Sequence, residues 1–143
     1  MCSSDLVRLL RLAELLEKKA DFGVRLKKAY DAADKEALRG FIAECDEIIE
    51  RIRALTEAHK KAFFTFNKPF GWELHDIRYG GMILRFTTTK ERILGYLNGE
   101  YDRLPELEEV RLPFKPSMDE KFESTFMWIR HRQIASPSLS LPI

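Results

Sequence analysis

Residues 34–66 read DKEALRGFIAECDEIIERIRALTEAHKKAFFTF, and this stretch decides the fold. Its apolar residues recur at intervals of three and four, which is the spacing of one face of an α-helix. Glu and Arg residues occupy the opposite face. The pattern predicts one long amphipathic helix whose apolar stripe consists of Leu38, Phe41, Ile42, Cys45, Ile48, Ile49, Ile52, Leu55, His59, Ala62, Phe63 and Phe66.

The residues that bound this helix are also recognisable. Asp34 precedes the stripe and is a favoured N-cap, because its carboxylate accepts a bond from a free backbone N–H of the first turn. Asn67 follows the last apolar residue and is expected to stop the helix in the left-handed conformation. Pro69 cannot continue a helix, since it lacks the backbone donor.

A second helical pattern lies upstream, from about Asp5 to Ala32, with Ser4 or Asp5 as its N-cap. Its apolar stripe is wide enough to contact two neighbours and includes Leu6, Leu9, Leu10, Leu12, Ala13, Leu15, Leu16, Ala20, Phe22, Val24, Leu26 and Tyr30. Gly23 in the middle of this helix predicts either close approach of a neighbouring helix or a slight kink.

A third helix is expected to start between Pro69 and Trp72 and to end at Asn98, where Asn98-Gly99 is a stop signal. The run Thr87-Thr-Thr89 consists of poor helix formers, so the helix is expected to fray or bend there. Gly80-Gly81, also within this helix, is interpreted as a place where another backbone approaches closely.

Connections of only a few residues force neighbouring helices to run antiparallel. The sequence therefore predicts an all-α protein, an elongated three-helix antiparallel bundle over residues 5–100. Residues 101–143 are expected to form an irregular C-terminal extension and tail, with one or two helical turns at Leu104–Val110.

Composition excludes several classes of function. The net charge is only +1, with basic and acidic residues interspersed, so neither nucleic acid nor membrane is expected as a partner. Two cysteines form no disulfide framework, and Cys45 is expected to be a buried apolar side chain. No signal-peptide pattern is present, which favours a cytoplasmic protein, although for a fragment the N-terminus carries no such information.

Two segments resemble a known family. The first, residues 67–81, reads NKPFGWELHDIRYGG, and the second, residues 12–26, reads LAELLEKKADFGVRL. Together they are similar to the C-terminal helical domain of bacterial family 20 glycoside hydrolases, the β-N-acetylhexosaminidases, over about residues 12–112. Residues 1–6 resemble a translated sequencing adapter from the edge of a metagenomic assembly, so we expect a fragment of a larger gene product.

The resemblance implies an accessory domain that is not catalytic alone. In the resembled enzymes this domain packs against the catalytic barrel and takes part in subunit contacts, so the expected partners are that barrel and a second copy in a homodimer. The residues expected at an interdomain or intersubunit surface are Asn67, Phe70, Trp72, Asp76, Arg78 and Tyr79; for Trp72 and Tyr79 a place in the bundle core is the favoured alternative. The alternative function is a stand-alone helical interaction module unrelated to carbohydrate.

No catalytic residue, metal site or cofactor is expected. The family's catalytic Asp-Glu pair follows a barrel strand, whereas Asp46-Glu47 lies on a solvated helix face and Asp119-Glu120 follows a loop, so surface charge is the preferred interpretation. The histidines, His59, His75 and His131, are far apart in the sequence and lack the spacing of metal ligands.

Overall fold

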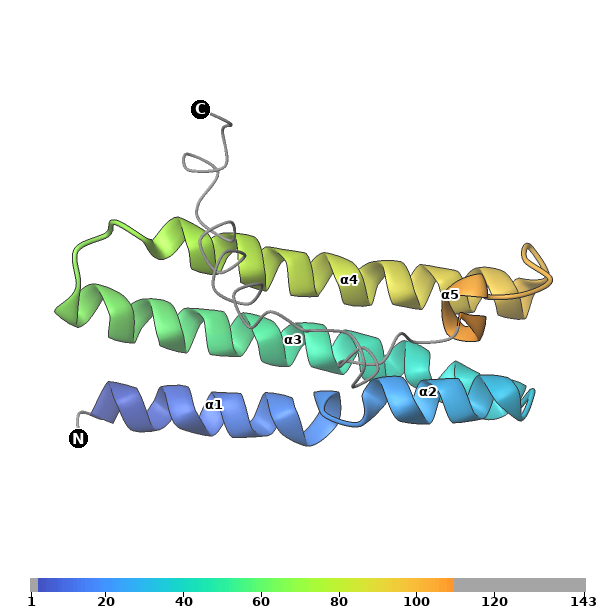
Figure 1. The fold of residues 1–143 in the computed structure, drawn as a ribbon. Coiled ribbons are helices and arrows are strands. Elements are labelled where there is room, and N and C mark those ends of the chain that lie inside the picture. Colours follow the sequence, from blue (N-terminus) through green and yellow to red (C-terminus); the bar gives the residue numbers. More distant parts are fainter. Residues whose placement is uncertain (1–2, 110–143) are drawn as a thin grey trace, which may run out of the picture.

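The computed structural model describes residues 3–109, which form four longer helices and one short one. The helices are α1 (Ser3–Lys19), α2 (Phe22–Asp31), α3 (Lys35–Phe66), α4 (Trp72–Asn98) and α5 (Pro105–Glu108). No strand occurs among the described residues. The predicted all-α bundle is confirmed, with α3 lying between the α1–α2 pair and α4 (Figure 1).

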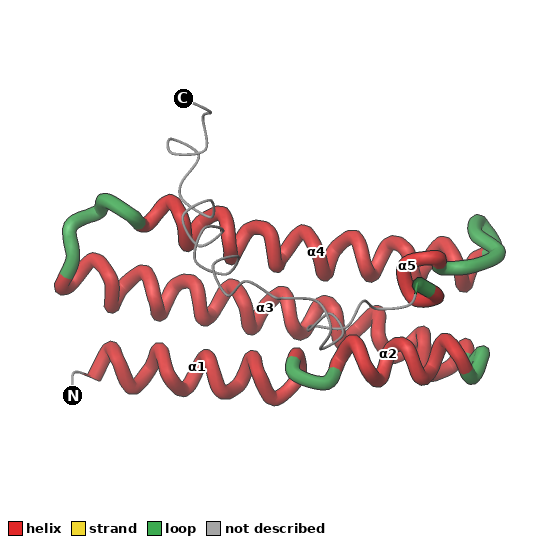
Figure 2. The backbone as a smooth tube through the Cα atoms, viewed as in Figure 1, coloured by secondary structure: helices red, strands yellow, loops and turns green. Residues whose placement is uncertain are grey.

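The prediction of one continuous helix from Asp5 to Ala32 is wrong, because this region forms two helices, α1 and α2. The chain turns at Ala20 and Asp21, and the backbone N–H groups of Val24 and Arg25 restart the hydrogen bonding from the carbonyl of Asp21. Figure 2 shows this turn as a short loop between α1 and α2. The apolar period keeps its phase across the turn, so the pattern alone predicts a continuous helix. Asp21 and Gly23 are weak helix formers, which makes a break here inexpensive.

The long central helix α3 begins after Asp34, as predicted. The Asp34 side chain accepts a hydrogen bond of 2.9 Å from the backbone N–H of Ala37. Most of the predicted stripe is buried, and Leu38, Cys45, Ile48 and Ile52 are fully so. Phe66 shares the period of the stripe but is 63% exposed, because it is the last residue of α3.

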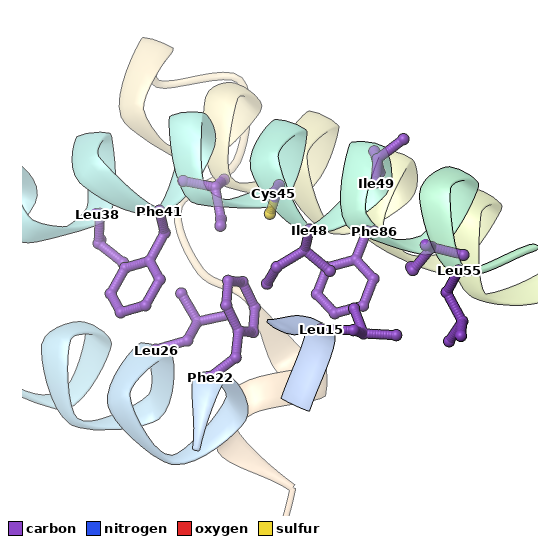
Figure 3. Packing of buried hydrophobic residues seen from close by; sticks show 12 residues of the cluster. Leu15, Phe22, Leu26, Leu38, Phe41, Cys45, Ile48, Ile49, Leu55 and Phe86 are labelled. Carbon is purple, nitrogen blue, oxygen red and sulfur yellow. The ribbon is translucent and has the colours of Figure 1, made fainter. Parts of the chain in front are cut away.

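The core lies at the junction of α2, α3 and α4. The Phe22 ring meets Phe41 of α3 and Phe86 of α4 edge-on, with ring centroids 5.3 and 5.2 Å apart, respectively. Figure 3 shows these side chains together with Leu15, Leu26 and Cys45. Phe22 of α2 therefore contacts both the central helix α3 and the helix α4 on its other side, which explains why the three helices pack as one unit.

The residues that end α3 and α4 differ in backbone conformation. Gly99 adopts the left-handed conformation, with φ of 77°, and ends α4 as predicted. Asn67 does not: its φ and ψ of −119° and 155° are extended, and the prediction of a left-handed stop is wrong. The positive φ falls instead on Gly71, the residue before α4. Glycine takes this conformation at no steric cost, so the turn places it there.

Residues 101–109 fold back onto the bundle. Leu104 is 1% exposed, and its backbone N–H donates a hydrogen bond of 3.0 Å to the Tyr30 hydroxyl, which itself donates to Glu108. An ion pair between Arg92 and Glu106 attaches α5 to α4 at 2.8 Å. The helical turn expected after Leu104 is α5, a single turn.

Two features predicted within α4 differ in the structure. The helix α4 continues through Thr87–Thr89 without a break, and the hydroxyls of Thr87 and Thr89 bond to carbonyls one turn earlier. A Cβ added at Gly80 or Gly81 would meet no atom within 4 Å, so the expected close approach of another backbone there is wrong. Within the part of the chain described, no helix has the length and apolarity needed to cross a bilayer.

Candidate interaction surface

The loop between α3 and α4 brings together the aromatic residues of the two helix ends. Trp72 begins α4, and its ring lies 5.3 Å from Phe63 and 5.4 Å from Phe64, both in the last turn of α3. Trp72 is only 5% exposed. Its indole N–H donates a hydrogen bond of 2.8 Å to Asp76, one turn further along α4. The indole is therefore both packed and satisfied, which is typical of a structural anchor.

Two histidines complete this cluster. The rings of His59 on α3 and His75 on α4 lie 4.6 Å apart, although sixteen positions separate them in the sequence. His59 Nδ1 is 2.8 Å from the Tyr79 hydroxyl. The two residues are far apart in the sequence, but the antiparallel helices α3 and α4 bring them to the same level of the bundle. His131 lies outside the described residues.

The surroundings of the pair favour the neutral form of both imidazoles. Burial is the main cause that lowers the pKa of His59, and the positive charges of the nearby His75 and Arg8 lower it further. Burial also lowers the pKa of His75, helped by Arg78 and opposed by Asp76. Tyr79 has a raised pKa, because burial disfavours its phenolate. The described residues contain no cluster of three metal-ligating groups, and two neutral imidazoles alone are a poor metal site.

The six predicted surface residues separate into two groups. Trp72 is buried and Tyr79 is half-buried against His59, so these two belong to the bundle. Asp76 is exposed but accepts the hydrogen bond of the Trp72 indole. Asn67, Phe70 and Arg78 are exposed, and Phe70 most of all, at 87%. Asn67 also closes α3, since its backbone N–H and its side-chain amide both donate to the carbonyl of Phe63.

The six residues named for this surface do not include two exposed phenylalanines, although the aromatic residues that cluster at this end of the bundle, Phe64 and Phe66 among them, predict more rings than three helices can bury. Phe64 is 40% exposed and Phe66 is 63% exposed. Both lie a few positions before Phe70, at the end of α3 that leads into the same loop. The signal that could identify them is the run Phe63-Phe64-Thr65-Phe66, since one helix face has no room for all three rings. We call Phe64, Phe66 and Phe70 the aromatic tip.

A second apolar surface lies on α1. Its buried side is centred on Leu15, while Leu6, Leu9, Leu10 and Leu16 are 45–57% exposed. These four leucines form the exposed face of α1. The helix packs on α3 and touches α2 at its end, so in the described part of the chain only one side of α1 is covered. The wide predicted stripe is present, but most of it remains open.

Carboxylates on α3 form ion pairs at the surface. Asp46 accepts from Lys90 at 2.6 Å, and Glu47 from Arg51 at 2.7 Å. Burial acts to raise the pKa of Glu47, but the bonds from Arg51 and Lys18 outweigh it, and the net pKa is lowered. A general acid in glycoside hydrolysis needs the opposite shift. Asp119 and Glu120 lie outside the described residues.

A comparison with models of known protein families gives a match to most of the chain. The family model described as the Glycoside Hydrolase 20C C-terminal domain matches residues 5–127. None of the curated proteins matches the chain. The matched region includes both segments that carry the resemblance, as well as every helix that the structure describes from residue 5 onward.

Proposed function

Because the chain belongs to the family of Glycoside Hydrolase 20C C-terminal domains, we propose that it is an accessory helical domain of a larger β-N-acetylhexosaminidase. In this role it braces the catalytic barrel and contributes to subunit contacts, and it performs no chemistry by itself. The observation that carries the proposal is the family match over residues 5–127. The ion-paired state of Asp46 and Glu47 supports the assignment of these carboxylates to the surface.

The exposed surfaces support the bracing role. A domain that packs against a larger one needs an apolar face that its own helices leave open. The exposed face of α1 has this character over four leucines, and the aromatic tip has it at the α3–α4 end. Burying one such side chain fully is worth about 1.5–3 kcal/mol, so either surface would contribute substantially to an interdomain contact.

A domain exchange tests the proposal. The C-terminal helical domain of a family 20C enzyme is replaced by residues 5–127, and the chimera is compared with the same enzyme lacking the domain. We expect the chimera to regain thermal stability and hydrolysis of a chromogenic N-acetylglucosaminide, while the isolated chain hydrolyses none. A chimera no more stable than the truncated enzyme would contradict the proposal and favour the stand-alone interaction module.

A matched variant sharpens the exchange. Leu9→Glu and Leu16→Glu place two charges on the exposed face of α1, whereas Ala43→Glu on α3 and Thr88→Glu on α4 place two at exposed positions outside it. If the face of α1 packs on the barrel, only the leucine variant lowers the stability of the chimera. Equal losses in both variants would show that added charge, and not a lost contact, is responsible.

A further inference from the structure

The aromatic tip exposes three phenylalanines within seven residues of the chain. Their exposed fractions rise along the loop, from 40% at Phe64 to 63% at Phe66 and 87% at Phe70. Single exposed apolar residues are ordinary, but a group of large rings at one end of a domain marks an interaction site. Phenylalanine is also among the residues enriched at the centre of protein interfaces.

The base of the tip is held in place by the fold. The Phe64 ring lies against Trp72 and Phe63, with centroids 5.4 and 5.6 Å apart. The loop is closed at both ends: Asn67 donates to the carbonyl of Phe63, and the backbone N–H of Gly71 donates to the Glu73 carboxylate at 2.9 Å. A surface ordered before binding loses less conformational entropy on binding, which favours a specific partner.

The segment that forms the tip carries charge of one sign, whereas the nearby carboxylates of Glu73 and Asp76 are bonded to the Gly71 N–H and the Trp72 indole. Lys60, Lys61 and Lys68 are exposed, and the sequence from Ala58 to Trp72 contains no Asp or Glu. Elsewhere in the helices basic and acidic residues alternate, and many form ion pairs with each other, such as Lys90 with Asp46. The lysines at the tip are therefore complementary to carboxylates on another surface.

We propose that the aromatic tip docks into an apolar hollow rimmed by carboxylates on the catalytic domain, with Phe70 inserted at its centre and Lys61 and Lys68 facing the rim. This inference rests on the proposed function and adds the chemistry of the partner surface. A protein partner is favoured over an anionic membrane, because three lysines attract anionic lipid by only about 1 kcal/mol each and the chain's net charge is +1.

A binding experiment in two components tests this inference. The complete 143-residue chain is titrated against the catalytic region of a family 20C enzyme expressed without its own C-terminal domain, at 50 and 300 mM NaCl. We expect Phe70→Ser to weaken binding about tenfold or more at both salt concentrations, which corresponds to about 1.4 kcal/mol. The double variant Lys61→Gln, Lys68→Gln should weaken binding mainly at 50 mM NaCl, because salt already screens these charges at 300 mM.

Matched controls come from the opposite end of the bundle, where α2 and the start of α3 lie (Figure 1). Val24→Ser removes an apolar side chain that is 53% exposed, and Lys28→Gln with Lys35→Gln removes two exposed lysines. Both controls should bind as the unchanged chain does. Thermal unfolding of every variant checks that the bundle is intact, which the exposure of Phe70 leads us to expect.

The outcomes separate this inference from the proposed function. If the unchanged chain does not bind the catalytic region, both are overturned. If it binds, but the Phe70 and lysine variants bind equally well, only the docking inference is overturned and the bracing role stands. Phe70-dependent binding to vesicles containing 30% phosphatidylserine, without binding to the catalytic region, would replace the protein partner with a membrane surface.

Discussion

At the scale of single residues, the centre of α3 is where the chain is least tolerant. Ile48 and Ile52 have no exposed surface, and Cys45 between the layers has none either. Burial raises the pKa of the Cys45 thiol to about 12, so the side chain is an inert apolar group at neutral pH. The next residue after Ile52, Arg53, is solvent-exposed and forms an ion pair with Glu50.

The contrast between these neighbours gives the first prediction. Ile52→Asp should destabilise the domain by several kcal/mol, since it removes packing and leaves a buried carboxylate without a partner. Arg53→Ala should change the free energy of unfolding by less than about 0.5 kcal/mol, because exposed ion pairs contribute little. Urea unfolding of both variants measures the difference. Equal shifts would mean that the burial pattern of α3 is wrong.

The histidine pair gives a prediction on pH. The pKa values of His59 and His75 are lowered in the folded state, so between pH 7.5 and 5.5 the unfolded chain binds more protons than the folded one. The contribution of this pair to stability is therefore fully present above about pH 6.5, the ordinary histidine pKa, and is lost as the pH falls through the lowered pKa values of the folded state. Urea unfolding at pH 7.5 and 5.5 measures this loss.

The variant His75→Gln separates this effect from other titrating groups. It removes one imidazole and relieves the repulsion that lowers the pKa of the other, so the loss of stability on acidification should be smaller than in the unchanged chain. Imidazole NMR signals should show the pKa of His59 rising in the variant. An unchanged pKa and an equal acid loss would show that the two rings titrate independently.

At the scale of elements, backbone conformation decides where each helix stops. At the end of α4, the N–H of Gly99 donates to the carbonyl of Tyr96 and the N–H of Glu100 to that of Gly95. This is the Schellman arrangement, which requires a left-handed residue at Gly99. Gly95 has a different role, because a Cβ there would overlap the ring of Tyr101. Gly80 has neither constraint.

Alanine substitutions at these three glycines should therefore not all change the free energy of unfolding in the same direction. Gly80→Ala should stabilise by up to about 1 kcal/mol, since alanine favours the helix and meets no neighbour. Gly99→Ala should destabilise by about 1–2 kcal/mol, because its φ of 77° is strained for any residue with a Cβ. Gly95→Ala should destabilise by displacing Tyr101, whose ring the Arg92 guanidinium covers at 4.2 Å. Thermal unfolding ranks the three variants, and a stabilising Gly99→Ala would exclude the left-handed stop.

At the scale of the whole molecule, the central helix α3 packs against helices on two of its sides. Because α3 is central, α1 and α4 each pack on it and each keeps an outer face (Figure 2). A three-helix arrangement of this kind has a single shared core and little capacity to cover further leucines. The exposed face of α1 and the aromatic tip are consequences of this layout, and both lie outside the core.

The isolated chain should therefore self-associate as its concentration rises from about 10 to 300 μM. Contiguous apolar patches of this kind promote association in water. Light scattering after size-exclusion chromatography measures the mass. The double variant Leu9→Glu, Leu16→Glu should shift the chain toward the monomer, while Ala43→Glu with Thr88→Glu, at exposed positions outside this face, should not. A chain that is monomeric throughout this range would argue against the exposed face of α1 as a contact.

Much of the architecture follows from local signals. The period of α3, the Asp34 cap and the Gly99 stop are visible in the chain, because each depends on residues within one or two turns of one another. The break at Asp21 was not predictable in this way, since the apolar residues on either side remain in phase. The positive φ at Gly71 was assigned to Asn67, because both residues tolerate it and only loop closure selects between them.

The candidate surface depended on tertiary structure to a greater extent. Sequence pattern placed Trp72, Asp76, Arg78 and Tyr79 on one helix, but a helical period says nothing about the rotation and level at which two helices meet. That geometry alone brings His59 to His75 and turns Trp72 inward while leaving Phe70 in solvent. Local propensity and patterning therefore specify the helices, whereas packing between helices decides which of their side chains remain available to a partner.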